Sequence, residues 1–438
     1  MRKGLTIGVL RERRPDEFRA PLSPPDVLWL KKRKIDIEVE SSPARAFRDA
    51  EYKASGAKIV DKFKNASLLL GIKEPDAHSL YRNSVYMVFS HTTKGNSKNL
   101  SIIKESVNRN ITLVDYEKIT DGAGNRLCYF GRMAGICGTV DSLYYLGKRL
   151  KHKGIRNPFT AIRPASEYSS FRELKNAMSR LSNKIRKDGF DRRISPFIIG
   201  ITGHGHVSQG ASEILGPLDP IEIHPRDMER FVRHQGKVRN KIYKIVFLRE
   251  EKLRSKDKKG FYFEEYLRHP QKFESNMDRY LPHLNILING SYWDKKFPRL
   301  VTKSMIRRLY GKRFRLEFIG DISCDIAGSV ELTYKATTFF NPTYTYNPKK
   351  DEYADGYKTD GIAILSRDNL PTELPKDASR DFSLLVREYV YQVAAHGVKD
   401  IANHVAIPAE VRRAVIVQQK KLTPPYRHLR SILRSKAL

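Results

Sequence analysis

Residues 196–211 read Pro-Phe-Ile-Ile-Gly-Ile-Thr-Gly-His-Gly-His-Val-Ser-Gln-Gly-Ala, an apolar run followed by a glycine turn and the start of a helix. The pattern G-x-G-x-x-S directly after a strand is typical of the first turn of a dinucleotide-binding domain. Gly203 and Gly205 carry no side chain, so backbone N–H groups at the helix N-terminus can approach a pyrophosphate. Without the strand, such glycines would fit an ordinary turn equally well. With it, we predict a dinucleotide site at Gly203, Gly205, Val207 and Ser208, the last standing where a third glycine is usual.

On both sides of this turn, short apolar runs alternate with polar, helix-like stretches. The runs cover residues 5–10, 35–39, 67–72, 85–90 and 111–115, and then residues 197–202, 221–224, 242–248, 285–289 and 316–321. This alternation is typical of mostly parallel sheets covered by helices. A chain of 438 residues is also long enough for two cores. We therefore predict an α/β fold of two Rossmann-like domains with parallel sheets.

The charge of the chain is strongly positive, with 81 Lys and Arg against 49 Asp and Glu and a formal net charge of +32. Such a charge attracts polyanions, so one alternative is a basic nucleic-acid-binding protein on a dehydrogenase scaffold. The basic residues are spread along the whole chain, often beside acids, and we find no recognition helix or zinc finger. This distribution favours a generally basic surface, which would also attract dinucleotides and dicarboxylates.

The cysteines predict neither a disulfide framework nor a metal site. Cys128, Cys137 and Cys324 are scattered and have no histidine cluster beside them. No apolar run is long enough to cross a bilayer, and residues 11–14 interrupt the first one with charges, which favours a strand over a signal peptide. We predict a cytoplasmic protein without a bound metal.

The choice of cofactor depends on the residues about 20 positions after the glycine turn, where an NAD site usually offers an acid to the ribose. Here the predicted strand at residues 221–223 ends in His224 and Arg226, which could accept a 2′-phosphate. Asp227 could instead bind the ribose hydroxyls. The sequence therefore favours NADP and leaves NAD open. Further along, residues 249–259 are highly charged and predict a solvated loop or helix face.

Polar side chains follow three apolar runs of the first domain. Lys73, His91 and Glu117 each stand one to three residues after such a run. In open α/β sheets the carboxyl ends of the strands face the ligand. A lysine, a histidine and a glutamate meeting there would supply the proton transfers that imine formation and reduction require. Taken singly, each would fit a solvated or capping side chain; the three together predict a catalytic site.

With these motifs in view, the chain resembles the lysine-2-oxoglutarate reductase (saccharopine dehydrogenase, L-lysine-forming) family, which is related in plan to alanine dehydrogenase and the transhydrogenase N-terminal domain. The resemblance covers nearly the whole chain, and residues 230–293 look like the reductase branch. It runs through Arg11-Glu12, Arg19 to Pro24, Gly71 to Pro75, Phe89 to Thr92, Asp115 to Lys118, Phe130-Gly131, Ala134-Gly135, Thr202 to Ala211, Glu265-Tyr266, His269-Pro270, Ile288 to Trp293, Asp321 to Asp325 and Asp368 to Pro375.

The resemblance implies roles for residues in both domains. Lys73 and His91 would be the acid-base pair, and Glu117, with Glu74, would tune their pKa values. The implied substrate-binding residues are Glu74 and two arginines, Arg19 and Arg126, which would hold carboxylates. Asn289, Asp321, Ser323 and Asp325 would lie near the cofactor, with a structural cap as the competing interpretation.

The implied activity is reductive condensation of L-lysine with 2-oxoglutarate to saccharopine, or the reverse, as in a saccharopine dehydrogenase (NADP+, L-lysine-forming). The enzyme acting next would be a saccharopine dehydrogenase of the L-glutamate-forming type. The nearest alternative is an NAD-dependent, alanine dehydrogenase-like amino-acid oxidoreductase. The domain plan of the family and the position of the 368–375 motif near the end of the chain predict three segments. These are a first domain at residues 1–135, a dinucleotide-binding domain at 136–341 and a C-terminal segment, 342–438, that returns to complete the first domain.

Overall fold

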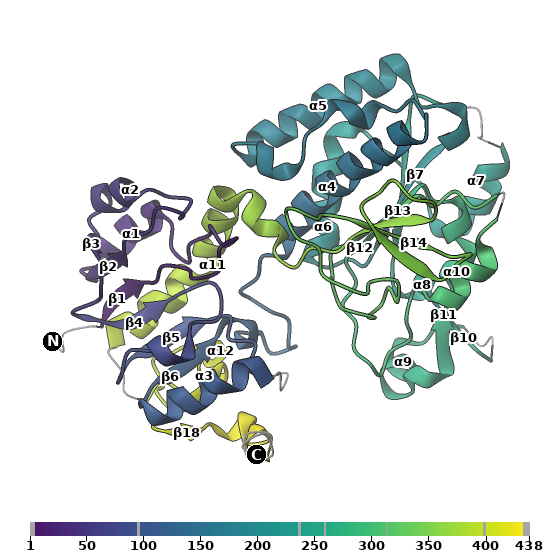
Figure 1. Ribbon diagram of the computed structural model, residues 1–438. Helices are drawn as coiled ribbons and strands as arrows, with labels where there is room; N and C mark the ends of the chain where they lie inside the picture. Colours follow the sequence, from purple (N-terminus) through teal and green to yellow (C-terminus); the bar gives the residue numbers. More distant parts are fainter. Residues whose placement is uncertain are drawn as a thin grey trace. The chain divides into compact units, whose positions relative to one another are not determined.

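The computed structural model describes residues 5–93, 97–234, 238–257, 260–311, 313–396 and 400–431. The chain divides into two compact units, one of residues 1–130 with 375–438 and one of residues 131–374. In Figure 1 the yellow-green and yellow C-terminal segments lie among the purple and blue N-terminal elements of the first unit. Within the described residues, none of the helices combines the length and the apolar character that crossing a bilayer requires.

The first unit is built on one mixed, mainly parallel sheet in the order β18-β17-β6-β5-β4-β1-β2-β3. Its strands are β1 (Thr6–Val9), β2 (Ile37–Glu40), β3 (Lys58–Val60), β4 (Ala66–Leu70), β5 (Val85–Val88), β6 (Thr112–Asp115), β17 (Val415–Gln418) and β18 (Lys421–Leu422). Its helices are α1 (Pro24–Lys31), α2 (Asp49–Ala54), α3 (Ser97–Asn108), α11 (Pro375–His396) and α12 (Ala409–Arg413). The strands from β6 to β3 are parallel, and β17 adds antiparallel to β6.

The C-terminal segment completes this sheet and its core. Helix α11 buries Phe382, Val386, Val390 and Val393, a spacing that places one apolar stripe on one helix face. This stripe packs into the same core as strands β1, β2 and β4. The prediction that the C-terminal segment completes the first domain is therefore confirmed.

The second unit contains a sheet in the order β15-β14-β16-β13-β12-β7-β9-β8 and a separate two-stranded hairpin. Its sheet strands are β7 (Phe197–Thr202), β8 (Ile221–Glu222), β9 (Ile242–Phe247), β12 (Ile286–Asn289), β13 (Phe318–Asp321), β14 (Tyr344–Asn347), β15 (Glu352–Asp355) and β16 (Ile362–Leu365), and the hairpin strands are β10 (Leu253–Ser255) and β11 (Phe273–Ser275). Its helices are α4 (Gly131–His152), α5 (Phe171–Asp188), α6 (His206–Leu215), α7 (Met228–His234), α8 (Arg249–Lys252), α9 (Phe263–Arg268) and α10 (Lys303–Leu309). The predicted α/β fold with two mainly parallel sheets is confirmed.

The expected boundary between residues 341 and 342 needs correction. Residues 344–365 form β14, β15 and β16, which pair with one another and with β13 in the second sheet. The chain returns to the first unit only at Pro375. An antiparallel addition to a parallel sheet carries no sequence signal of its own, so the late strands could not be assigned to a domain by pattern alone.

The observed order of strands beside β7 also differs from the strand order on which the prediction for His224 and Arg226 depended. β9 pairs with β7 over its whole length, and β8 pairs only with β9 at the sheet edge. His224 and Arg226, which follow β8, therefore lie one strand further from the glycine turn than expected. The prediction for residues 249–259 was wrong for its first part, because Lys252, Leu253 and Ser255 are buried; residues 258 and 259 lie outside the described residues.

Candidate functional site

The glycine turn lies at the carboxyl end of β7 and has the geometry that a pyrophosphate site needs. Gly203 adopts a φ of +95°, a region that side-chain-bearing residues rarely occupy. Gly205 caps α6, and a Cβ added there would meet no atom within 4 Å. The Oγ atom of Ser208 donates a hydrogen bond to the carbonyl oxygen of Thr202 at 2.9 Å and so ties the first turn of α6 back to the strand. These residues fit a bound dinucleotide, because space lies open in front of the helix N-terminus.

Helix α6 is held close to α4 by two glycines. A Cβ on Gly135 would lie 2.0 Å from the carbonyl oxygen of Val207, and a Cβ on Gly210 would lie 2.0 Å from that of Arg132. Beside this crossing, Arg132 and Glu213 form a bidentate ion pair with N–O distances of 2.7 and 2.6 Å. The small-residue stretch 131–138 thus permits close helix packing.

Three of the predicted cofactor residues form a hydrogen-bonded network at the ends of β12 and β13. The Asn289 side chain donates to Asp321 at 2.8 Å and to Ser323 at 3.2 Å, and Ser323 donates to Asp321 at 2.6 Å. Asn289 and Asp321 are fully buried, and burial raises the pKa of Asp321. The network holds the carboxyl ends of the strands in register, in keeping with the capping interpretation. Asp325 follows in the next loop, where its carbonyl oxygen accepts a hydrogen bond from Gly328.

The residues predicted to select the cofactor lie at the edge of the second sheet. The side chains of His224 and Arg226 are 50 % and 77 % exposed. The Nε2 atom of His224 lies 4.0 Å from Oε1 of Glu251, in the helix that follows β9. The strand next to β7 is thus followed by α8, whose residues the sequence analysis did not assign to the cofactor site.

In the first unit, Lys73, His91 and Glu117 follow β4, β5 and β6, which are neighbouring parallel strands. Their carboxyl ends therefore meet at one edge of the sheet. The Nδ1 atom of His91 lies 2.7 Å from Oε1 of Glu74. Burial lowers the pKa of His91, but the hydrogen bond and charge of Glu74, with the charge of Glu117, raise it overall. His91 also adopts a φ of +48°, a strained conformation of the kind that clusters at functional sites.

Glu117 is held by Arg126, whose Nη2 atom lies 2.6 Å from Oε1 of the glutamate. Arg126 is positioned by a turn in which the Asp121 carboxylate accepts hydrogen bonds from the backbone N–H groups of Ala123 and Asn125. Glu117 is almost fully buried and Arg126 is half exposed. The structure therefore brings the predicted tuning carboxylate and one predicted carboxylate-binding arginine into direct contact.

Glu12 lies at the same edge of the first sheet. The sequence analysis assigned no role to this carboxylate. Its side chain accepts hydrogen bonds from the backbone N–H groups of Ile72 at 2.6 Å and Lys73 at 3.1 Å. Burial of the carboxyl raises the pKa of Glu12 to about 7. Glu12 thus fixes the backbone at Lys73. The sequence held one signal for this role, because Glu12 stands shortly after β1. Since β1 pairs with β4, a residue at that position lies near the residues that follow β4.

Arg19 is buried and bound to its near neighbour Glu17. Its Nε and Nη2 atoms lie 2.7 and 2.5 Å from the two carboxylate oxygens. Although burial opposes it, the charge and hydrogen bonds of Arg19, with the charge of Lys73, lower the pKa of Glu17. The guanidinium also lies 4.1 Å above the ring of Phe130, which stacks on Phe382 of α11. The C-terminal segment thus packs against residues at this edge of the first sheet.

Within the described residues, no group of His, Cys, Asp and Glu side chains is arranged to hold a metal ion.

The chain has the α/β fold of an alanine dehydrogenase. An L-alanine dehydrogenase structure matches 98 % of this chain and 100 % of its own length with a TM-score of 0.62 at 17 % sequence identity. Residues 8–137 match the family described as alanine dehydrogenase/PNT, N-terminal domain.

The chain is also similar in sequence to two kinds of enzyme. It is 32 % identical over 441 residues to an alpha-aminoadipic semialdehyde synthase of Arabidopsis thaliana, a match that covers 97 % of this chain and 41 % of the synthase. It is 24 % identical over 392 residues to a saccharopine dehydrogenase [NAD(+), L-lysine-forming] of Emericella nidulans, covering 86 % of this chain and 89 % of that one. The family resemblance drawn from the motifs is confirmed over nearly the whole chain. The chain spans less than half the length of the semialdehyde synthases it matches.

Proposed function

We propose that this chain is a nicotinamide-dependent oxidoreductase that joins L-lysine to 2-oxoglutarate, giving saccharopine, or runs that reaction backwards. The observation that carries the proposal is the edge of the first sheet, where a histidine paired with Glu74 and a lysine anchored through Glu12 follow adjacent parallel strands. The similarity to an L-lysine-forming saccharopine dehydrogenase of comparable extent supports the choice of substrates.

The reaction needs two proton-transfer groups. The ε-amine of the substrate lysine attacks the ketone of 2-oxoglutarate, the carbinolamine loses water, and the resulting imine accepts a hydride. The bound nicotinamide supplies that hydride. The amine must lose a proton before it attacks, and the carbinolamine hydroxyl must gain one before it leaves as water.

His91 and Lys73 are the proposed acid-base pair. Because Glu74 stabilises the protonated imidazole, His91 carries a proton at higher pH than an isolated histidine and is suited to protonate the leaving hydroxyl. Lys73 is then the proposed base for the substrate amine. Its backbone is fixed by Glu12, and the charge of Lys73 acts on both Glu17 and Glu74.

Arginines are the proposed partners of the substrate carboxylates. Saccharopine carries three carboxylates, and a guanidinium can bind a carboxylate through two parallel hydrogen bonds. Arg126, half exposed and already paired with Glu117, is suited to exchange part of that contact for a substrate carboxylate. Arg19 is the second proposed partner, and its ion pair with Glu17 holds the guanidinium in a fixed orientation.

The proposed cofactor is NADP(H), with NAD(H) as the alternative. The side chains of His224, Arg226 and Arg249, at the carboxyl ends of β8 and β9, offer hydrogen-bond donors that favour a 2′-phosphate, whereas Glu251 favours the ribose hydroxyls. The proposed consumer of saccharopine is a dehydrogenase of the L-glutamate-forming type.

Oxidation of NADPH and of NADH, followed at 340 nm with 2-oxoglutarate and a panel of amino acids, tests the proposal. Turnover with L-lysine and 2-oxoglutarate, and formation of saccharopine by mass spectrometry, are the expected results. Turnover with pyruvate and ammonia instead would replace this function by an alanine dehydrogenase activity.

A further inference from the structure

A buried lysine lies beside the glycine turn of the second unit. Lys252, the last residue of α8, is only 7 % exposed, and its Nζ atom donates a hydrogen bond to Oγ of Ser291 at 2.8 Å. Ser291 follows β12, and the same Oγ lies 3.5 Å from the position of a Cβ on Gly203. Since β9 and β12 flank β7 on its two sides, the lysine side chain crosses the carboxyl end of β7. Its ammonium group therefore lies next to the turn.

Within the described part of the chain, this ammonium group has no ion-pair partner. The acceptor that it binds is a neutral hydroxyl. Burial, together with the nearby charge of Arg249, lowers the pKa of Lys252 to about 8, although Glu250 and Glu251 oppose the shift. A buried positive charge without an anion is costly to fold, so its presence indicates an anion that arrives later.

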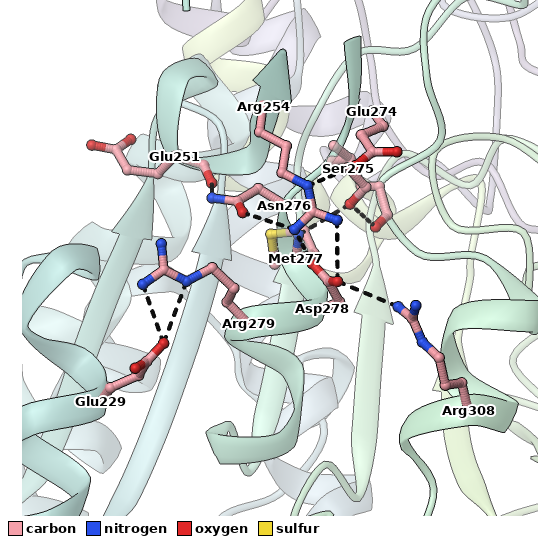
Figure 2. A network of polar contacts seen from close by, with 11 residues as sticks. Glu229, Glu251, Arg254, Glu274, Ser275, Asn276, Met277, Asp278, Arg279 and Arg308 are labelled. Carbon is pink, nitrogen blue, oxygen red and sulfur yellow. Dashed lines mark hydrogen bonds and ion pairs between the residues drawn. The ribbon is translucent and has the colours of Figure 1, made fainter. Parts of the chain in front are cut away.

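The backbone that carries Lys252 is fixed independently of any ligand. Figure 2 shows the network, in which the Asn276 side chain donates to the carbonyl oxygen of Glu251 at 3.0 Å. The backbone N–H of Asn276 donates to the carbonyl oxygen of Lys252 at 2.8 Å. Arg254, two residues later, binds Glu274 at 2.7 Å and Asp278 at 3.1 Å (Figure 2). The hairpin β10–β11 and this network thus hold Lys252 in place.

We propose that Lys252 binds the pyrophosphate of the dinucleotide, as the charged partner of the glycine turn. The proposal rests on the dinucleotide binding assumed in the proposed function. The pyrophosphate, rather than the 2′-phosphate, is the phosphate expected at the turn and at the N-terminus of α6. Because both NADPH and NADH carry it, Lys252 strengthens the binding of the two cofactors alike and does not select between them.

Titration of the ligand-free protein with ADP-ribose, NADPH and NADH, followed by calorimetry, tests the proposal. ADP-ribose carries the pyrophosphate but neither the 2′-phosphate nor the nicotinamide. Lys252→Met should weaken all three by about 10- to 100-fold, the range of a lost hydrogen bond to a charged group. The melting temperature without ligand should not fall, because the variant removes an uncompensated buried charge. A lysine with only a structural role would lower it.

Lys244→Met is the matched control. It removes a lysine from β9 itself, one paired with the exposed Glu222, and should leave all three affinities unchanged. Lys252→Arg keeps the charge and should retain most of the affinity. In the wild-type protein, ADP-ribose should slow acetylation of Lys252, measured by mass spectrometry, and not that of Lys244, which provides a test even if the variants fail to fold.

Unchanged affinities in Lys252→Met, or no protection of Lys252, would overturn the proposal. A loss confined to NADPH would assign the lysine to the 2′-phosphate and would also overturn it. A wild type that binds ADP-ribose through Lys252 but does not turn over lysine and 2-oxoglutarate would leave this inference standing and reject the proposed function. A wild type that binds none of the three ligands would reject both.

Discussion

The Nδ1 atom of His91 and the Oε1 atom of Glu74 lie 2.7 Å apart, with side chains 34 % and 33 % exposed. The two residues follow adjacent parallel strands, so the sheet itself sets this distance. Burial alone would raise the pKa of Glu74, but the hydrogen bond and charge of His91 lower it to about 2. The pair therefore couples a proposed proton-transfer group to a carboxylate whose pKa is held well below its ordinary value.

Glu74→Gln should lower the pKa of His91, because the variant removes the hydrogen bond and charge that raise it. An NMR titration of the imidazole measures the shift, and the limb of the activity profile governed by His91 should move to lower pH with it. As a control, Glu105→Gln removes a carboxylate of α3 that pairs with Arg109, and it should leave the titration of His91 unchanged. An unmoved His91 titration in Glu74→Gln would refute the coupling.

The ion pair of His91 and Glu74 should stabilise the fold most between about pH 4.5 and 6.5. The contribution of Glu74, whose folded pKa is lowered, is present above its ordinary value of 4.5 and is lost as pH falls towards 2. The contribution of His91, whose folded pKa is raised, is present below 6.5 and is lost as pH rises through the raised value. Urea unfolding at a series of pH values should show the difference between wild type and Glu74→Gln to be largest inside this window; a constant difference would contradict the account.

Lys73→Met and His91→Gln should each depress turnover by about a hundred- to ten-thousand-fold, the usual contribution of general acid-base groups. Cofactor binding should survive in both, because the glycine turn belongs to the other compact unit. Steady-state kinetics and NADPH titration measure the two effects separately. Lys53→Met, at an exposed position on α2, serves as the control. Near wild-type turnover in both active-site variants would remove the catalytic assignment.

Gly205→Leu should abolish dinucleotide binding while the fold stays intact. A Cβ added there meets no atom within 4 Å apart from its chain neighbours, so the leucine side chain would begin in the open space in front of α6. Gly203→Ala makes the informative comparison, because the φ of +95° strains any side chain and should lower the melting temperature itself. Calorimetric binding and thermal unfolding, measured on both variants, separate the two causes. If Gly205→Leu binds NADPH as tightly as wild type, the turn is not the pyrophosphate site.

Glu12→Gln should reduce turnover and weaken the fold, because an amide offers only one oxygen to the backbone donors of Ile72 and Lys73. Leaving one buried donor without an acceptor costs about 1–3 kcal/mol. Since burial raises the folded pKa of Glu12 to about 7, wild-type stability should fall as pH rises from 4.5 to 7, and the variant should lack this decline. Chemical denaturation across that range measures it; identical pH profiles would show that Glu12 does not titrate as described.

By itself, the sequence determined the parts of this protein that depend on neighbours in the chain. The run 197–202 followed by Gly203 and Gly205 predicted a strand, a turn and a helix N-terminus, because backbone conformation at glycines and the period of apolar residues are local properties. The positions of Lys73, His91 and Glu117 after apolar runs predicted their common edge for the same reason.

Only the tertiary structure decided which distant segments lie together. It placed β9 instead of β8 beside β7, joined α11 to the first core, brought Glu12 to the backbone of Lys73, and buried Lys252 within a stretch whose charge had predicted exposure. Strand order and burial arise from pairing and packing between residues far apart in the chain. Local composition does not encode them, because a charged side chain is buried wherever the surrounding fold encloses it.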